Sequence, residues 1–85
     1  MNLIRSDSFK DDFKKLPVHL KRRTEKVLRL LAGNIRHPSL RIKKMGGNEH
    51  ICEVRVSQGY RLTLQWNPGS YLLRHVGKHD ILRRP

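Results

Sequence analysis

The sequence predicts an α+β fold in which an antiparallel β-sheet has two N-terminal helices packed on one face. Apolar residues recur with a helical period of about 3.6 before residue 34, and with a period of two after residue 40. The chain has no internal repeat and no linker-like stretch, and its 85 residues suit one domain. We therefore expect a single domain over residues 1–85 with the element order β-α-α-β-β-β-β.

Two tandem helices are expected over residues 8–33. Phe9, Phe13 and Leu16 are spaced i, i+4, i+7, which places them on one face of a helix. Pro17 then ends that helix and can occupy the first turn of the next one. The second helix has one face of apolar residues and threonine, made of Leu20, Thr24, Val27, Leu28 and Leu31.

The strands follow from alternation. Leu3-Ile4 is expected to form a short strand at one side of the sheet, and Leu40–Met45 and Tyr71–Val76 are further strand candidates. Between them, a tight connection at Ser57-Gln58-Gly59 joins two alternating segments. This register places Val54 opposite Leu62, Arg55 opposite Arg61 and Glu53 opposite Thr63, so both strands agree on which face is apolar.

The charge of the chain points to an anionic partner. It has 19 Lys and Arg against 7 Asp and Glu, a formal net charge of +12. Such an excess in a small domain is typical of nucleic-acid binding, although a merely solubilising surface is the alternative. The sequence has no long apolar run, no signal-peptide pattern and a single cysteine, Cys52. We expect a cytoplasmic protein with no membrane partner and Cys52 as a small core residue.

The polar face of the predicted sheet holds the candidate chemistry. Arg61 and Arg55 lie opposite each other, and like charges in that position cost stability unless an anion lies between them. A guanidinium binds phosphate through two parallel hydrogen bonds, although Arg61 could instead only pair with Glu53. Lys78 and His79 are expected near this cluster, and an imidazole suits proton transfer near pH 7. Few carboxylates and one cysteine make a metal site unexpected, so no cofactor is predicted.

Taken together, these segments resemble the RelE/ParE toxin superfamily over nearly the whole chain. The resemblance rests on their order and on four motifs, which are Phe13-Lys14-Lys15-Leu16-Pro17, His37-Pro38-Ser39-Leu40, Glu53-Val54-Arg55-Val56-Ser57-Gln58-Gly59-Tyr60-Arg61-Leu62 and Val76-Gly77-Lys78-His79-Asp80. The resemblance implies a toxin of a type II toxin–antitoxin pair. RelE-type members are metal-independent endoribonucleases that cut mRNA in the ribosomal A site, whereas ParE-type members inhibit DNA gyrase.

The same resemblance implies roles for individual residues. Arg61 falls on the phosphate-binding arginine of the family, and Lys78 and His79 follow Val-Gly, where RelE-type members place a basic or histidine residue. The hypothesis is that Arg61, His79 and Glu53 are catalytic, and that the RNA phosphates contact the basic residues Arg55, Lys78, Lys43 and Lys44. Many RelE-type members have a catalytic tyrosine after this motif, but here residues 81–85 contain none.

The leading hypothesis is therefore a ribosome-dependent mRNA endoribonuclease that inhibits translation. Its partners would be mRNA, the ribosome with its 16S rRNA, and a cognate antitoxin whose tail wraps the domain with acidic groups near Arg55, Arg61 or Lys78. Two alternatives remain open at this point. One is a ParE-like inhibitor of gyrase, and the other is a catalytically weak RNA-binding module, which the missing tyrosine favours.

Overall fold

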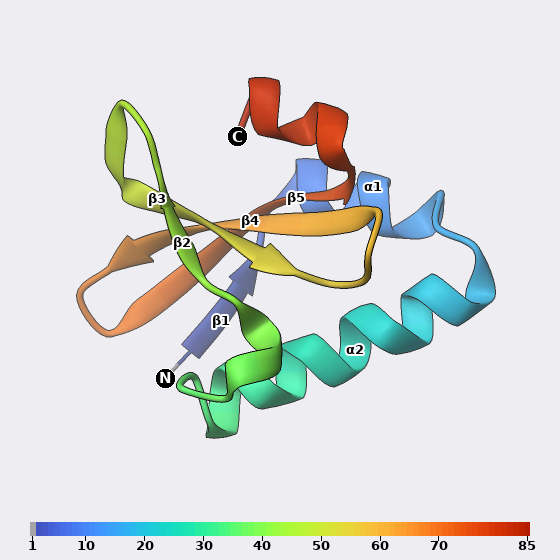
Figure 1. Cartoon of the computed structure of the whole chain (residues 1–85), viewed down its shortest axis with the longest axis horizontal. Helices are drawn as coiled ribbons and strands as arrows, with labels where there is room; N and C mark the ends of the chain where they lie inside the picture. The colour runs from blue at the N-terminus through green and yellow to red at the C-terminus, as the bar shows by residue number, and fades with distance from the viewer. Residues whose placement is uncertain (1) are drawn as a thin grey trace.

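The computed structural model describes residues 2–85, leaving out the side chains of residues 48 and 49. Helices and strands follow each other in the predicted order, and two 3₁₀ segments are added (Figure 1). The elements are β1 (Asn2–Arg5), α1 (Asp7–Lys14), α2 (Val18–Gly33), η1 (Pro38–Leu40), β2 (Lys43–Met45), β3 (Asn48–Arg55), β4 (Tyr60–Asn67), β5 (Ser70–Lys78) and η2 (His79–Arg83).

The strands form one sheet in the order β1-β5-β4-β3-β2. Strands β2 to β5 pair antiparallel, but β1 runs parallel to β5, so the sheet is mixed rather than wholly antiparallel. The helices separate β1 from the hairpins, so no tight turn forces β1 into an antiparallel pairing. The α+β class is confirmed, and the direction of β1 differs from the expected antiparallel sheet.

Both helices contribute to a single core with the apolar face of the sheet. The predicted register between β3 and β4 is confirmed, with Val54 opposite Leu62 and Arg55 opposite Arg61. Each helix turns its apolar face inward, as the spacing of its apolar residues requires. The core includes Phe9, Leu20, Val27, Leu28, Leu31, Val54, Leu62, Leu73 and Val76.

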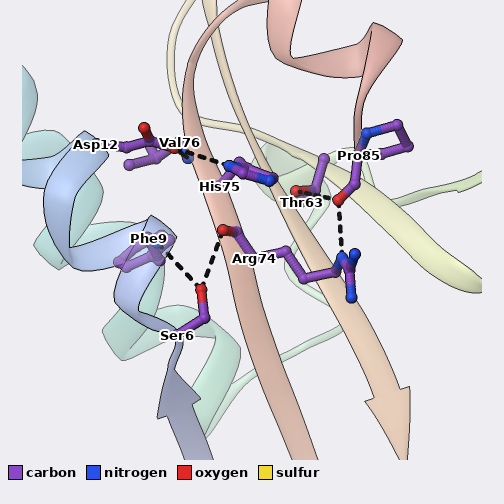
Figure 2. Close-up of polar contacts among 8 residues, drawn as sticks. All are labelled: Ser6, Phe9, Asp12, Thr63, Arg74, His75, Val76 and Pro85. Carbon is purple, nitrogen blue, oxygen red and sulfur yellow. Dashed lines mark hydrogen bonds and ion pairs between the residues drawn. The ribbon is translucent and has the colours of Figure 1, made fainter.

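Side chains from the start of α1 continue the edge of β5 where β1 ends (Figure 2). The Ser6 hydroxyl donates to the carbonyl oxygen of Arg74 at 3.1 Å and accepts from the backbone N–H of Phe9 at 3.1 Å, which caps α1. Asp12 Oδ2 accepts from the backbone N–H of Val76 at 3.2 Å. These contacts satisfy backbone groups in the part of β5 that β1 does not reach, which would otherwise be left to water or to another chain.

The strand candidate Leu40–Met45 is shorter in the structure, because Leu40 belongs to η1 and β2 begins only at Lys43. His37 caps η1, since its Nδ1 accepts from the backbone N–H of Ser39 at 3.2 Å. Arg41 follows in the left-handed region, at φ 45° and ψ 50°. That conformation interrupts an extended chain, which explains why the strand cannot begin at residue 40.

The last strand is longer than the predicted Tyr71–Val76 and contains a bulge. Thr63 lies opposite His75 and Leu64 lies opposite Leu73, so Arg74 has no partner on β4. The buried apolar residues of β5 are therefore spaced two and then three apart, at residues 71, 73 and 76. Because of the bulge, the residues of β5 after Arg74 lie on the opposite face of the sheet from the one that strict alternation would give them.

The C-terminal segment covers part of the sheet face that the sequence suggested would be open to solvent. Figure 1 shows η2 on the side of the sheet away from α2. The buried Thr63 hydroxyl donates to the carbonyl oxygen of Pro85 at 3.3 Å, and Arg74 Nε donates to the same oxygen at 2.8 Å (Figure 2). The expectation of a polar face that is wholly open to solvent is therefore wrong, because the residues in the middle of this face are packed under η2.

Candidate functional site

An open groove of about 380 Å³ lies on the polar face beyond η2, at the β2–β3 side of the sheet. We call it the first groove. It contains four of the predicted site residues, on three neighbouring strands, and its lining is Arg41, Ile42, Lys43, Glu53, Arg55 and Arg61. Four cations against one carboxylate give the lining a net charge of +3, which suits an anionic ligand.

Arg61 is held by the hairpin turn that precedes it. Its Nη1 donates to the carbonyl oxygens of Ser57, Gln58 (3.3 Å) and Tyr60 (2.9 Å). Among the described residues nothing accepts from Nε or Nη2, so this edge of the guanidinium remains available. A fixed guanidinium with two free donors is the arrangement that binds a phosphate through two hydrogen bonds.

Arg55 lies directly across from Arg61 and is half-buried. Within residues 2–85, as far as their side chains are described, no hydrogen bond or ion pair holds its guanidinium. Glu53 does not neutralise it, because the Glu53 carboxylate lies 3.8 Å from Lys43 Nζ on β2. This ion pair also answers the alternative raised by the sequence, since the partner of Glu53 is Lys43 rather than Arg61.

The other three predicted residues lie outside the first groove. Lys78 is the partner of Tyr60, so its side chain leaves the sheet on the face opposite to Arg61, where it lines a depression beside α1. Lys44 is the partner of Cys52 and likewise points away from Glu53. His79 is exposed at the start of η2 and does not line this groove. Of the seven predicted residues, the structure therefore brings together only Lys43, Glu53, Arg55 and Arg61.

No protein-family model matches the sequence, and no curated protein matches it either. Solved structures do resemble the chain. It superposes on a chain of the RelB–RelE antitoxin–toxin complex from Methanococcus jannaschii with a TM-score of 0.78, at 21% identity over 95% of each chain. A chain of the DinJ–YafQ toxin–antitoxin complex from E. coli gives 0.75, at 16% identity over 95% of this chain and 94% of that chain. The YoeB/ParE toxin from Agrobacterium tumefaciens gives 0.76, at 12% identity over 93% and 99%.

The chain has the RelE/ParE toxin fold. The likeness extends over almost the full length of both this chain and its structural neighbours, so it includes both helices and most of the sheet. In this RelE-like fold the last five residues, which contain no tyrosine, lie on the sheet beside Thr63 and Arg74. The missing tyrosine, by which the sequence departs from many RelE-type members, therefore concerns the C-terminal segment that contains η2.

The RelE-like fold also joins two residues that sequence reasoning did not connect. His75 Nδ1 lies 3.0 Å from Asp12 Oδ2, on β5 and α1 respectively, and both side chains are partly exposed (Figure 2). Asp12 thus binds the side chain of His75 and the backbone of Val76 with one oxygen. From the sequence, this pair could have been predicted only together with the bulge at Arg74, because the bulge determines the face of β5 on which His75 lies.

Three further observations concern metal ligands, membrane-spanning helices and Cys52. In the part of the chain that the structure describes, no three His, Cys, Asp or Glu side chains gather where they could hold a metal ion. No helix within residues 2–85 is long and apolar enough to cross a membrane. Cys52 packs against the core as expected, and burial raises the pKa of its thiol while the nearby charge of Lys44 opposes that shift.

Proposed function

We propose that this protein is the toxin of a type II toxin–antitoxin system, acting as a metal-independent endoribonuclease on mRNA at the ribosome and so inhibiting translation. The RelE/ParE fold supports the toxin role, and the first groove supports an RNA substrate. The observation that carries the proposal is the pair Arg55 and Arg61, held side by side in a groove of net positive charge with no acidic group between them.

In this proposal Arg55 and Arg61 hold the scissile phosphate and stabilise the negative charge that grows on it during cleavage. A general base takes the proton from the ribose 2′-OH, and the 2′-oxygen attacks the phosphorus in line with the departing 5′-oxygen. The products are a 2′,3′-cyclic phosphate and a 5′-hydroxyl. A neighbouring group acting as general acid, Lys43 or His79, donates a proton to the 5′-oxygen as it leaves, which gives the 5′-hydroxyl.

The geometry favours Glu53 over His79 as the general base. Glu53 lies in the first groove with Arg55 and Arg61, whereas His79 does not line it. A base must reach the proton that it removes, so its position matters before its pKa does. His79 remains the alternative, because it is exposed at the end of β5 and a bound RNA strand can extend to it.

Partners follow from the same reasoning. Lys44 and Lys78 lie outside the first groove, and we propose that they contact mRNA or the 16S rRNA of the ribosome as point charges. A cognate antitoxin would neutralise the basic surface with acidic groups near Arg55, Arg61 or Lys78, in a cytoplasmic complex. The structural neighbours include antitoxin–toxin complexes, which supports a partner of this kind.

The test is cleavage of mRNA on programmed ribosomes, with cut positions mapped by primer extension. Wild-type protein is expected to cut at codon-defined positions, and Arg61→Gln and Arg55→Gln are expected to lose this activity. Arg29→Gln is the matched control, because Arg29 is exposed on α2 and lines neither this groove nor another described one. Absence of cleavage by the wild type overturns the proposal, and inhibition of gyrase supercoiling would establish the ParE-like alternative in its place.

A further inference from the structure

A second basic groove adjoins the first. It has a volume of about 190 Å³ and lies between α2, η1 and the end of β3. Its charged lining consists of Arg23, Lys26, Arg41 and Arg55, above the apolar side chains of Val27 and Leu30. Arg41 and Arg55 line both grooves, so the two form one continuous basic surface from α2 to Arg61.

The charge of the second groove is not compensated from within. Among the side chains that the structure describes no acidic one lines it, whereas elsewhere Arg5 pairs with Glu25 at 3.5 Å and Lys43 pairs with Glu53. Four cations around so small a volume repel one another, and that repulsion is a cost to folding which a bound anion would relieve. The groove is therefore better suited to holding anions than to stabilising the free protein.

Arg23 has a fixed position at one end of this groove. Its Nε donates to the carbonyl oxygen of Val56 at 2.9 Å, which ties α2 to the end of β3. The same bond anchors the guanidinium while its two terminal nitrogens remain unpaired among the described residues. Preorganised donors lose less entropy on binding than freely moving ones, so Arg23 is placed to hold a phosphate.

The backbone of Arg41 gives an independent indication. Among residues 2–85 it alone of the non-glycine residues has a positive φ, at 45°. Glycine or asparagine fits this left-handed conformation at lower cost, and a strained residue of another type points to a role for its side chain. Here that side chain lines both grooves, at the point where they meet.

We propose that the second groove binds backbone phosphates of the same RNA strand that the first groove cleaves, next to the scissile nucleotide. Arg41 and Arg55 then lie between the two sites, and Arg23 and Lys26 hold the phosphates furthest from Arg61. This inference rests on the proposed function for the identity of the strand. Continuity with the first groove favours single-stranded RNA over an acidic peptide, because one extended polyanion can occupy both grooves without a break.

The experiment compares Arg41→Gly and Lys26→Gln with Arg29→Gln, which removes the same charge from α2 outside the groove. The probes are uncleavable 2′-O-methyl oligonucleotides of three and ten nucleotides, and affinity is measured by fluorescence anisotropy over a range of salt. Each groove variant is expected to weaken binding of the ten-nucleotide probe about tenfold and to lower the salt slope by about 0.7. Binding of the three-nucleotide probe, which fills the first groove, is expected to change much less in Lys26→Gln, because Lys26 lines the second groove alone, whereas Arg41→Gly is expected to weaken both probes.

The design separates this inference from loss of structure and from failure of the proposed function. Arg41→Gly relieves backbone strain, so its Tm is expected to equal or exceed that of the wild type while its RNA affinity falls. Equal binding of the ten-nucleotide probe by Arg41→Gly, Lys26→Gln and Arg29→Gln overturns the inference, even if the wild type cleaves mRNA. Weaker binding of a polyglutamate peptide without weaker binding of RNA also overturns it, and assigns the groove to an acidic protein segment.

Discussion

Gly77 lies directly under Ile81, so closely that a Cβ atom at residue 77 would be 2.9 Å from Ile81 Cγ2. Gly77 is also the partner of Arg61 on β4. The absence of a side chain at residue 77 therefore lets the C-terminal segment pack flat on β5, immediately beside the strand position of the proposed phosphate-binding arginine. This contact makes the position of η2 testable.

Substituting Gly77→Ala is expected to loosen η2 without disrupting the sheet. The added methyl group overlaps Ile81, a β-branched residue with little freedom to move, and overpacking of this kind costs about 1–3 kcal/mol. Trypsin should then cut after Arg83 faster than in the wild type. The substitution Ile81→Ala makes room for the methyl group. In that background Gly77→Ala should cost nothing, so trypsin should cut the double variant no faster than Ile81→Ala alone. Additive effects of the two substitutions would contradict the contact.

Asp12→Asn is expected to lower the free energy of unfolding by about 1 kcal/mol or more. The Asp12 carboxylate accepts from the backbone N–H of Val76 and lies 3.0 Å from His75 Nδ1, and an uncharged amide is a weaker acceptor for both. Urea denaturation provides the measurement. Asp11→Asn is the control, since Asp11 is the adjacent, exposed acidic residue of the same helix. Equal losses in the two variants would mean that the bond to β5 does not contribute.

Substitutions of Arg55 and Arg61 are expected to affect the stability of the protein differently, although both residues serve the proposed site. Arg61 holds three carbonyl oxygens of the hairpin turn, so Arg61→Gln should lower the unfolding free energy by about 1–2 kcal/mol. Arg55→Gln removes an unpaired charge opposite Arg61 and should leave stability unchanged or raise it. Cleavage by either variant should fall at least about a hundredfold. A stable Arg55→Gln variant with full activity would remove Arg55 from the site.

Cys52 should react slowly with iodoacetamide in the folded protein. Burial raises the pKa of its thiol above the ordinary 9.0, so less thiolate is present at pH 8 than in the urea-unfolded chain. Lys44 opposes this shift, and Lys44→Gln should therefore slow alkylation further. Because the folded pKa is the higher one, the associated stability is present below pH 9 and lost as the pH rises through the folded pKa. Faster alkylation of Lys44→Gln than of the wild type would contradict this assignment.

The register of the central hairpin could be predicted because two strands alternate in the same phase. Val54 with Leu62 and Arg55 with Arg61 can satisfy both strands only in one pairing, since a shift of one residue would turn the apolar face to solvent. The groove residues of β2, β3 and β4 follow from that register. Sequence alone is sufficient wherever the pattern of burial determines the face on which a side chain lies.

The remaining features depend on contacts that the alternation of apolar and polar residues does not reveal. A single extra residue at Arg74 sets the phase of the second half of β5, and only the spacing of buried residues 71, 73 and 76 indicates it. The positive φ of Arg41 has no signal in local composition, because an arginine is not a residue that turns favour. The expectation that Lys78 lies near Arg61 rests on where the last strand ends, whereas its pairing with Tyr60 puts its side chain on the other face.

The parallel pairing of β1 with β5 has a consequence for how the protein is made. Asn2 lies opposite Ser70, so the first strand to be synthesised waits for the last before it has a partner. Closing so long a loop costs entropy before any pairing is gained, and chains with such distant contacts fold slowly. We expect the nascent chain to emerge with β1 unpaired and α1 unanchored, and to complete its sheet only after β5 has left the ribosome.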